Sequence, residues 1–200
     1  GLNQGQPQRI DYGLKLTGQA GAQDIGVLQV RTGQEGSRIG EDFTVFRARR
    51  RFLNESHAGV IYTRRSPRER ITKDPATRSE QALQTLGADL RLSTTEFLGD
   101  KNLGVQTHYV HTTNLDGTGK SGRYGIGFEY PNDFIFVTSR FNETQANFDP
   151  AVGFVMRRGV KELRTTLRVG PRPRNHPWIR QFTFGLDHVR ITDSKNDLLT

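Results

Sequence analysis

The sequence contains no cysteine, so disulfides, zinc–thiolate sites and cysteine nucleophiles are excluded together. It also lacks any apolar run approaching the ~20 residues of a membrane helix, so that any membrane passage would have to use strands. Only 33% of the 200 residues are hydrophobic. A soluble two-layer domain of this size usually shows stronger apolar runs, whereas a barrel with a polar interior tolerates this composition.

Motifs for common chemistry are missing as well. There is no complete Gly-x-x-x-x-Gly-Lys-Ser/Thr phosphate loop, no Gly-x-Ser-x-Gly elbow and no His-Glu-x-x-His motif. His108 and His111 are three residues apart, which places them on opposite faces of a strand. We therefore expect neither a metal nor a cofactor. The net charge of +8 is dispersed rather than grouped in a tail or helix, so we expect no nucleic-acid partner.

What the sequence does contain is period-two alternation of polar and apolar residues, which predicts β-strands. Several of these stretches reach the ~9–11 residues that cross a bilayer at a tilt, whereas soluble strands average ~5–6. The ten predicted strands are Ile10–Gln19, Gln23–Thr32, Asp42–Phe52, His57–Arg65, Gln81–Ser93, Leu103–Thr112, Gly122–Tyr130, Asp133–Phe141, Lys161–Gly170 and Trp178–Thr192.

The connections between these strands predict an up-and-down meander. Five short turns, such as Ala20–Ala22 and Pro131–Asn132, alternate with four long loops. Outer-membrane barrels have tight turns at one end and long loops at the other. We therefore predict an all-β, antiparallel transmembrane β-barrel, or part of a larger one, with about ten strands here. The long loops are Gly33–Glu41, Ser66–Glu80, Thr113–Ser121 and Asn142–Val160.

Alternation is clearest in Gly122–Tyr130, where the apolar face begins and ends with tyrosine, as in the aromatic girdles of membrane barrels. A half-exposed sheet in a soluble protein would alternate in the same way. Two stretches fit less well. Asp133–Phe141 is apolar on both faces near its start, so its lipid side is unassigned. Arg50 shares a face with Phe46, and we place it at the membrane interface, beside the turn at Leu53–Glu55.

The opposite faces of the strands carry the charges that would line a barrel interior. Cations outnumber anions there by eight to four. Cross-strand Arg–carboxylate pairs could simply fill the interior, or the surplus cations could favour anionic solutes in a pore. A hydrolase would need two carboxyl groups at a defined separation, which nothing in the sequence establishes. The twelve lumen-lining candidates are Lys15, Arg47, Arg49, Arg51, Asp89, Arg91, Arg123, Glu129, Glu162, Arg164, Arg168 and Asp187.

The long loop Asn142–Val160 is too apolar to be freely solvated. Three interpretations remain open: the loop folds inward as a constriction, packs against a part of the protein outside this segment, or packs on the barrel rim. The candidate residues for a constriction are Asn147, Phe148, Asp149, Pro150, Gly153 and Phe154.

Local motifs resemble a known family. The segments 12–18, 25–28 and 43–65 resemble the opening of an uncharacterised barrel domain that follows a family 9 carbohydrate-binding-like module in bacterial envelope proteins. The segment 147–155 is similar to the Asn-Phe-Asn-Pro-Glu-Val-Gly-Phe-Val loop of that family, with Asp149 and Ala151 in place of Asn and Glu. The resemblance implies a porin-like outer-membrane barrel and no established reaction.

Taken together, residues 1–200 are expected to be a segment of one barrel domain, without the carbohydrate-binding-like module and further strands. No signal peptide is visible in Gly1–Gln8, so we expect the segment to come from a longer precursor. The expected location is the outer membrane of a Gram-negative bacterium, in contact with lipid. The expected role is passage or docking of a polar, anionic or glycan-related solute. The alternatives are a barrel-associated glycan hydrolase using lumen carboxylates and a soluble β-rich binding module.

Overall fold

The computed structural model describes residues 2–3, 6–34, 39–68, 82–113, 119–174 and 176–199. In these ranges every regular element is a β-strand. No helix of the described chain is long and apolar enough to cross a membrane. The loop predicted at Ser66–Glu80 lies almost entirely outside the described residues, as do parts of the loops at Gly33–Glu41 and Thr113–Ser121.

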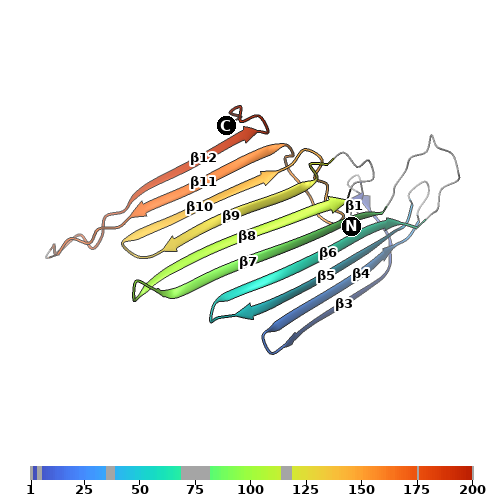
Figure 1. Ribbon diagram of the computed structural model, residues 1–200, viewed down its shortest axis with the longest axis horizontal. Helices are drawn as coiled ribbons and strands as arrows, with labels where there is room; N and C mark the ends of the chain where they lie inside the picture. The colour runs from blue at the N-terminus through green and yellow to red at the C-terminus, as the bar shows by residue number, and fades with distance from the viewer. Residues whose placement is uncertain are drawn as a thin grey trace.

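Ten strands form one antiparallel sheet in strict sequence order (Figure 1). This confirms the predicted all-β meander. The sheet is open, because each of its two outermost strands pairs with one neighbour among the described residues. A two-stranded ribbon, β1 (Leu2–Asn3) and β2 (Gln6–Pro7), precedes it. The sheet consists of β3 (Ile10–Ala20), β4 (Gln23–Thr32), β5 (Glu41–Phe52), β6 (Ser56–Pro67), β7 (Leu83–Phe97), β8 (Lys101–Thr113), β9 (Gly122–Pro131), β10 (Ile135–Thr144), β11 (Val160–Val169) and β12 (Phe184–Asp193).

The start of the last strand differs from the prediction. β12 begins at Phe184 rather than Trp178, so the β11–β12 connection is a long segment and the fifth predicted short turn is wrong. The ladder ends where Val169 pairs with Phe184. Extending it along the chain after β11 would need backbone donors at Pro171 and Pro173, which proline lacks.

The two ends of the sheet differ as the sequence predicts, except at the β11–β12 connection. Tight turns join β3 to β4, β5 to β6, β7 to β8 and β9 to β10 at one end, drawn on the left in Figure 1. Gly21 in the first of these turns has a φ of 57°, in the left-handed region that favours glycine. The connection of β10 to β11, residues 145–159, lies at the other end. We call the two ends the turn end and the loop end.

The strands are strongly staggered. Starting from Lys15 in the middle of β3, the residues directly opposite on successive strands are Leu28, Val45, Thr63, Thr85 and finally Thr112, the second-to-last residue of β8. A line perpendicular to the strands therefore runs off the loop end within a few strands. Such a shear is what tilts the strands of a barrel relative to its axis.

The register also defines two faces, because residues directly opposite on paired strands share a face. All twelve predicted lumen-lining residues lie on one of them, the polar face. The same register assigns the ambiguous strand β10: Arg140 lies on the polar face, and Val137 on the apolar face. Arg50 is exposed on the apolar face opposite Ala58, close to the turn that follows β5.

The sheet has almost no hydrophobic core. Phe148 and Ala151 are the two buried hydrophobic residues of the described chain. The accessible surface is 14216 Å², whereas a folded monomer of this mass is expected to expose about 9,500 Å². On the apolar face, more than half of the surface of Leu14, Ile126 and Leu186 is exposed. One face of the sheet is therefore not covered by another layer of protein.

Candidate functional site: the polar face of the sheet

Ion pairs on the polar face cross from one strand to the next but one. Arg47 on β5 reaches Asp89 on β7, with 2.5 Å between Nη1 and Oδ2. The contact passes over Gly59 of β6, where a Cβ atom would lie 3.0 Å from Asp89 Oδ2. His57 Nε2 lies 3.7 Å from the other carboxylate oxygen of Asp89. One carboxylate thus serves two basic side chains.

A second crossing repeats this arrangement on the next strands. Arg91 on β7 reaches Glu129 on β9, with 2.9 Å between Nη2 and Oε2. The pair passes beside Gly104 of β8, where a Cβ would be 3.7 Å from the Arg91 guanidinium. Arg140 on β10 approaches the other oxygen of Glu129 at 3.4 Å. Glu129 is therefore shared by two guanidinium groups.

Asp24 on β4 is shared in the same way. Arg49 Nη2 lies 2.8 Å from its Oδ2 atom, and Arg51 Nη2 lies 3.8 Å from its Oδ1 atom. Two carboxylates fall outside this pattern: Glu162 pairs with Arg164 on its own strand, and Asp187 accepts a hydrogen bond of 2.6 Å from Thr166. Cations therefore exceed anions along the middle of the face.

Three cations of the polar face carry this surplus. Within the ranges that the structure describes, none of Lys15, Arg123 and Arg168 has a carboxylate within 4.0 Å. The guanidinium of Arg168 instead lies over the ring of Phe136. It is 5.4 Å from the ring centroid, within the ~6 Å at which a cation is attracted to an aromatic face. A mobile anion could bind these three cations without displacing a carboxylate of the described chain.

The structure therefore brings half of the twelve predicted lumen-lining residues into one lattice of charges and adds others. The six are Arg47, Arg49, Arg51, Asp89, Arg91 and Glu129. Asp24, Arg140 and His57 belong to the same lattice of charges and were missed. Alternation could have found Asp24, which shares its face with Gly26. Arg140 was hidden because β10 begins with apolar residues on both faces. Nothing in the sequence marked Gly59 and Gly104, because their position next to the ion pairs depends on the register of the strands.

The loop between β10 and β11 folds over the polar face. The backbone N–H of Ala151 donates to Thr85 Oγ1 on β7 at 2.9 Å, and this hydroxyl also contacts Thr112 Oγ1 at 2.9 Å. Ala151 is 3% and Phe148 4% exposed. The loop thus reaches past β9 and β8 to the loop end of β7, a contact that fits both an inward fold and packing on the rim. Phe154, in contrast, is 85% exposed.

The other residues predicted for a constriction lie around this anchor. The side-chain amide of Asn147 donates to the backbone oxygen of Gly119 at 2.9 Å, which ties the loop to the β8–β9 connection. Asp149 forms an ion pair of 2.6 Å with Arg158 within the loop. Gly153 has a φ of 138°, and a Cβ there would lie 3.6 Å from Pro150. The loop is therefore held by its own polar contacts as well as by the sheet.

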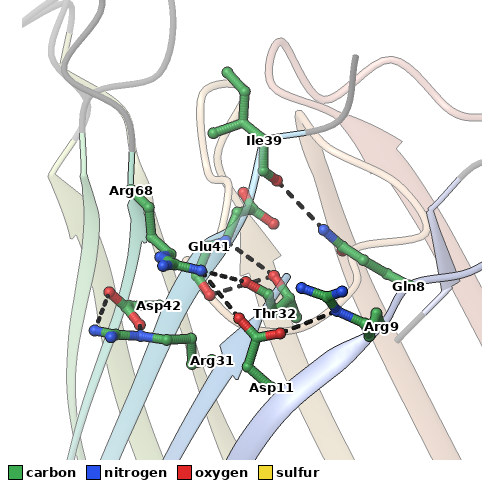
Figure 2. A network of polar contacts seen from close by, with 9 residues as sticks. All are labelled: Gln8, Arg9, Asp11, Arg31, Thr32, Ile39, Glu41, Asp42 and Arg68. Atoms are coloured by element: carbon green, nitrogen blue, oxygen red, sulfur yellow. Dashed lines mark hydrogen bonds and ion pairs between the residues drawn. The ribbon is translucent and has the colours of Figure 1, made fainter. Parts of the chain in front are cut away.

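Polar contacts also fasten the loop end of β3 to β6, as Figure 2 shows. Arg68, just after β6, lies 3.1 Å from the carboxylate of Asp11 and donates to the backbone oxygen of Thr32 at 3.2 Å. Arg31 and Asp42 form a bidentate pair at 2.7 and 3.1 Å. Four consecutive strands are therefore cross-linked at this end by charged side chains.

No group of three or more His, Cys, Asp or Glu residues arranged to hold a metal ion occurs in the described part of the chain. Comparisons with protein-family models, with curated proteins and with solved structures found no match to this chain. The functional argument therefore depends on the geometry of the two faces.

Proposed function

We propose that the chain forms an outer-membrane β-barrel, or a section of one, whose polar face lines a passage for polar and preferentially anionic solutes. The observation that carries this proposal is the exposed apolar face, which spans ten paired strands while the opposite face holds ion pairs. Water-soluble monomers rarely expose contiguous apolar patches larger than a few hundred Å². Lipid chains are the natural cover for such a face.

The tyrosines support a membrane orientation. All five lie on the apolar face, because each pairs in register with other residues of that face. Tyr12 lies under the guanidinium of Arg31 at 5.1 Å, and Tyr124 donates to Glu143 at 2.6 Å near the loop end. At the turn end, Tyr130 packs edge-on against Phe97. An apolar ring with a polar partner is typical of residues at a membrane–water interface.

The anionic preference follows from the composition of the polar face. Asp24, Asp89 and Glu129 are each shared by two basic groups, and three further cations have no carboxylate partner in the described chain. Rings and rows of basic side chains favour anions in pores. The folded-in loop anchored at Thr85 would narrow such a passage, so that solute size as well as charge is selected.

The alternative of a glycan hydrolase makes a different demand. A glycosidase needs one protonated and one ionised carboxyl group beside the sugar bond. Asp89 and Glu129 instead each pair with two basic side chains rather than with a second carboxyl group. Their arrangement is explained by charge pairing, and the observations favour passage over hydrolysis.

The experiment that tests the proposal is conductance of the purified chain, reconstituted in a planar bilayer under a salt gradient. We expect discrete channels with a reversal potential on the anion-selective side. A chain that stays monodisperse in water without detergent, and does not insert, would contradict the proposal. Insertion as a closed barrel without conductance would refute passage and point to a docking role.

A further inference from the structure

A hollow of about 260 Å³ opens on the polar face across β6 to β10. Its polar lining includes Asp89, Arg91, Gln106, His108, Arg140 and Asn142. Bare backbone at Gly127 forms part of the floor, and a Cβ there would lie 2.9 Å from Gln106 Nε2. At the nearby Gly125, a Cβ would lie 2.8 Å from Cε1 of the lining residue His108. Glycines on β9 thus let the side chains of β8 and β10 lie low and keep the hollow open.

The hollow presents donors for an anion on one side. Arg91 and Arg140 come from different strands and share the single carboxylate of Glu129, at 2.9 and 3.4 Å. Each guanidinium has five N–H donors. Arg91 uses three of them, on Glu129, Ser93 and Gln106, and Arg140 uses one, on Glu129, so both keep donors for a further anion. Because two positive charges meet one negative charge, a further anion beside them is favoured. A planar guanidinium matches a carboxylate in bidentate fashion.

The remaining lining suits hydroxyl groups. The side-chain amides of Gln106 and Asn142 both donate and accept, and Asp89 is an acceptor whose position is fixed by Arg47 at 2.5 Å. A volume below the about 300–1,000 Å³ of drug-sized pockets indicates a solute of roughly one sugar ring. A dianion such as phosphate would be repelled by the nearby carboxylates of Asp89 and Glu129.

We propose that this hollow is a binding site for a small polyhydroxylated monocarboxylate, of the sugar-acid class. The carboxylate of the solute contacts the remaining donors of Arg91 and Arg140, and its hydroxyl groups contact Asn142, Gln106 and Asp89. This inference rests on the proposed function, because the hollow would bind the solute on its way through the passage. Binding itself can be measured without any membrane transport.

The test is calorimetric titration of the purified chain in detergent micelles with galacturonate, with galactose and inorganic phosphate as the other two probes. We expect galacturonate to bind at least tenfold more tightly than either. Arg140→Gln should weaken galacturonate binding at least tenfold, which corresponds to about 1.4 kcal/mol. The control is Arg172→Gln, which removes the same charge from the β11–β12 connection, where Arg172 pairs with Asp133. Its affinity should match that of the unmodified chain.

Each result decides the inference. Equal binding of phosphate and galacturonate would reduce the hollow to a general anion site, and undiminished binding by the Arg140→Gln chain would place the solute elsewhere. Absent binding by a chain with an intact β-sheet circular dichroism spectrum would also overturn it. Channels without galacturonate binding would refute this inference alone, whereas binding without channels would refute passage and leave the site standing.

Discussion

Arg47 and Asp89 are joined by an ion pair of 2.5 Å although a whole strand lies between them. The pair exists because Gly59 of the intervening strand has no side chain in its path. Gly104 lies beside the Arg91–Glu129 pair in a looser arrangement, where a Cβ would make ordinary contact with both side chains at 3.6–3.7 Å. Glycines on the polar face therefore allow long side chains to lie along the sheet, and the charges form a lattice across strands.

Gly125, another glycine of the polar face, lies so close to the backbone of β10 that adding a side chain should destabilise the fold. At Gly125, a Cβ atom would lie 2.7 Å from the backbone oxygen of Phe141, which cannot move aside as a side chain can. Gly125→Ala should lower the free energy of unfolding by about 1–3 kcal/mol. The measurement is urea-induced unfolding in lipid vesicles.

The matched control for this change is Gly26→Ala on the same face, where the nearest atom to a new Cβ would be 3.9 Å away. It should be nearly neutral. Equal effects of the two alanines would show that the tight contact at Gly125 is not what matters.

The apolar face predicts a different sensitivity to charge. Ile126 lies in the middle of β9 on that face and is 55% exposed. If lipid covers it, Ile126→Arg should destabilise the folded state in vesicles by about 2–4 kcal/mol. Val189→Arg introduces the same side chain on the polar face of β12 and should cost far less. A similar cost for both would argue against lipid on the apolar face.

The hydrogen bond that anchors the β10–β11 loop to β7 can be removed by a single substitution. Thr85→Val removes the hydroxyl that accepts the N–H of Ala151, so the loop should detach and single-channel conductance should rise. The control is Thr63→Val on the neighbouring strand, because the buried Thr63 hydroxyl has no hydrogen-bond partner in the described structure. Its replacement should leave conductance unchanged and stability equal or higher. Unaltered conductance in the Thr85 variant would show that the loop does not narrow the passage.

Charge removal at Glu129 should shift ion selectivity. Glu129→Gln leaves Arg91 and Arg140 without their shared carboxylate, so anion preference, measured as reversal potential under a salt gradient, should increase. Glu96→Gln, at the turn end of β7, removes an equal charge outside the lattice and should shift the potential little. A shift of the Glu129 variant toward cation preference would contradict the assignment of this face to the passage.

Much of this architecture was predictable because a strand repeats every two residues. Period-two patterns predicted ten strands, and the twelve lumen candidates do share one face. The pattern failed at β10, whose first residues are apolar on both faces, and at the start of β12, where prolines end the ladder. The contact of Ala151 with Thr85 joins residues 66 apart and depends on three-dimensional placement, so no local pattern could predict it.

The central claim, that one face of the sheet meets lipid and the other water, can be tested residue by residue. The chain has no cysteine, so each introduced cysteine is unique. Consecutive positions from Leu163 to Arg168 in β11, a strand segment without glycine, would be replaced one at a time and reacted, in vesicles, with a membrane-impermeant thiol reagent. We expect reaction at 164, 166 and 168 on the polar face and protection at 163, 165 and 167. Uniform reaction along the strand, or protection of the opposite set, would contradict the account.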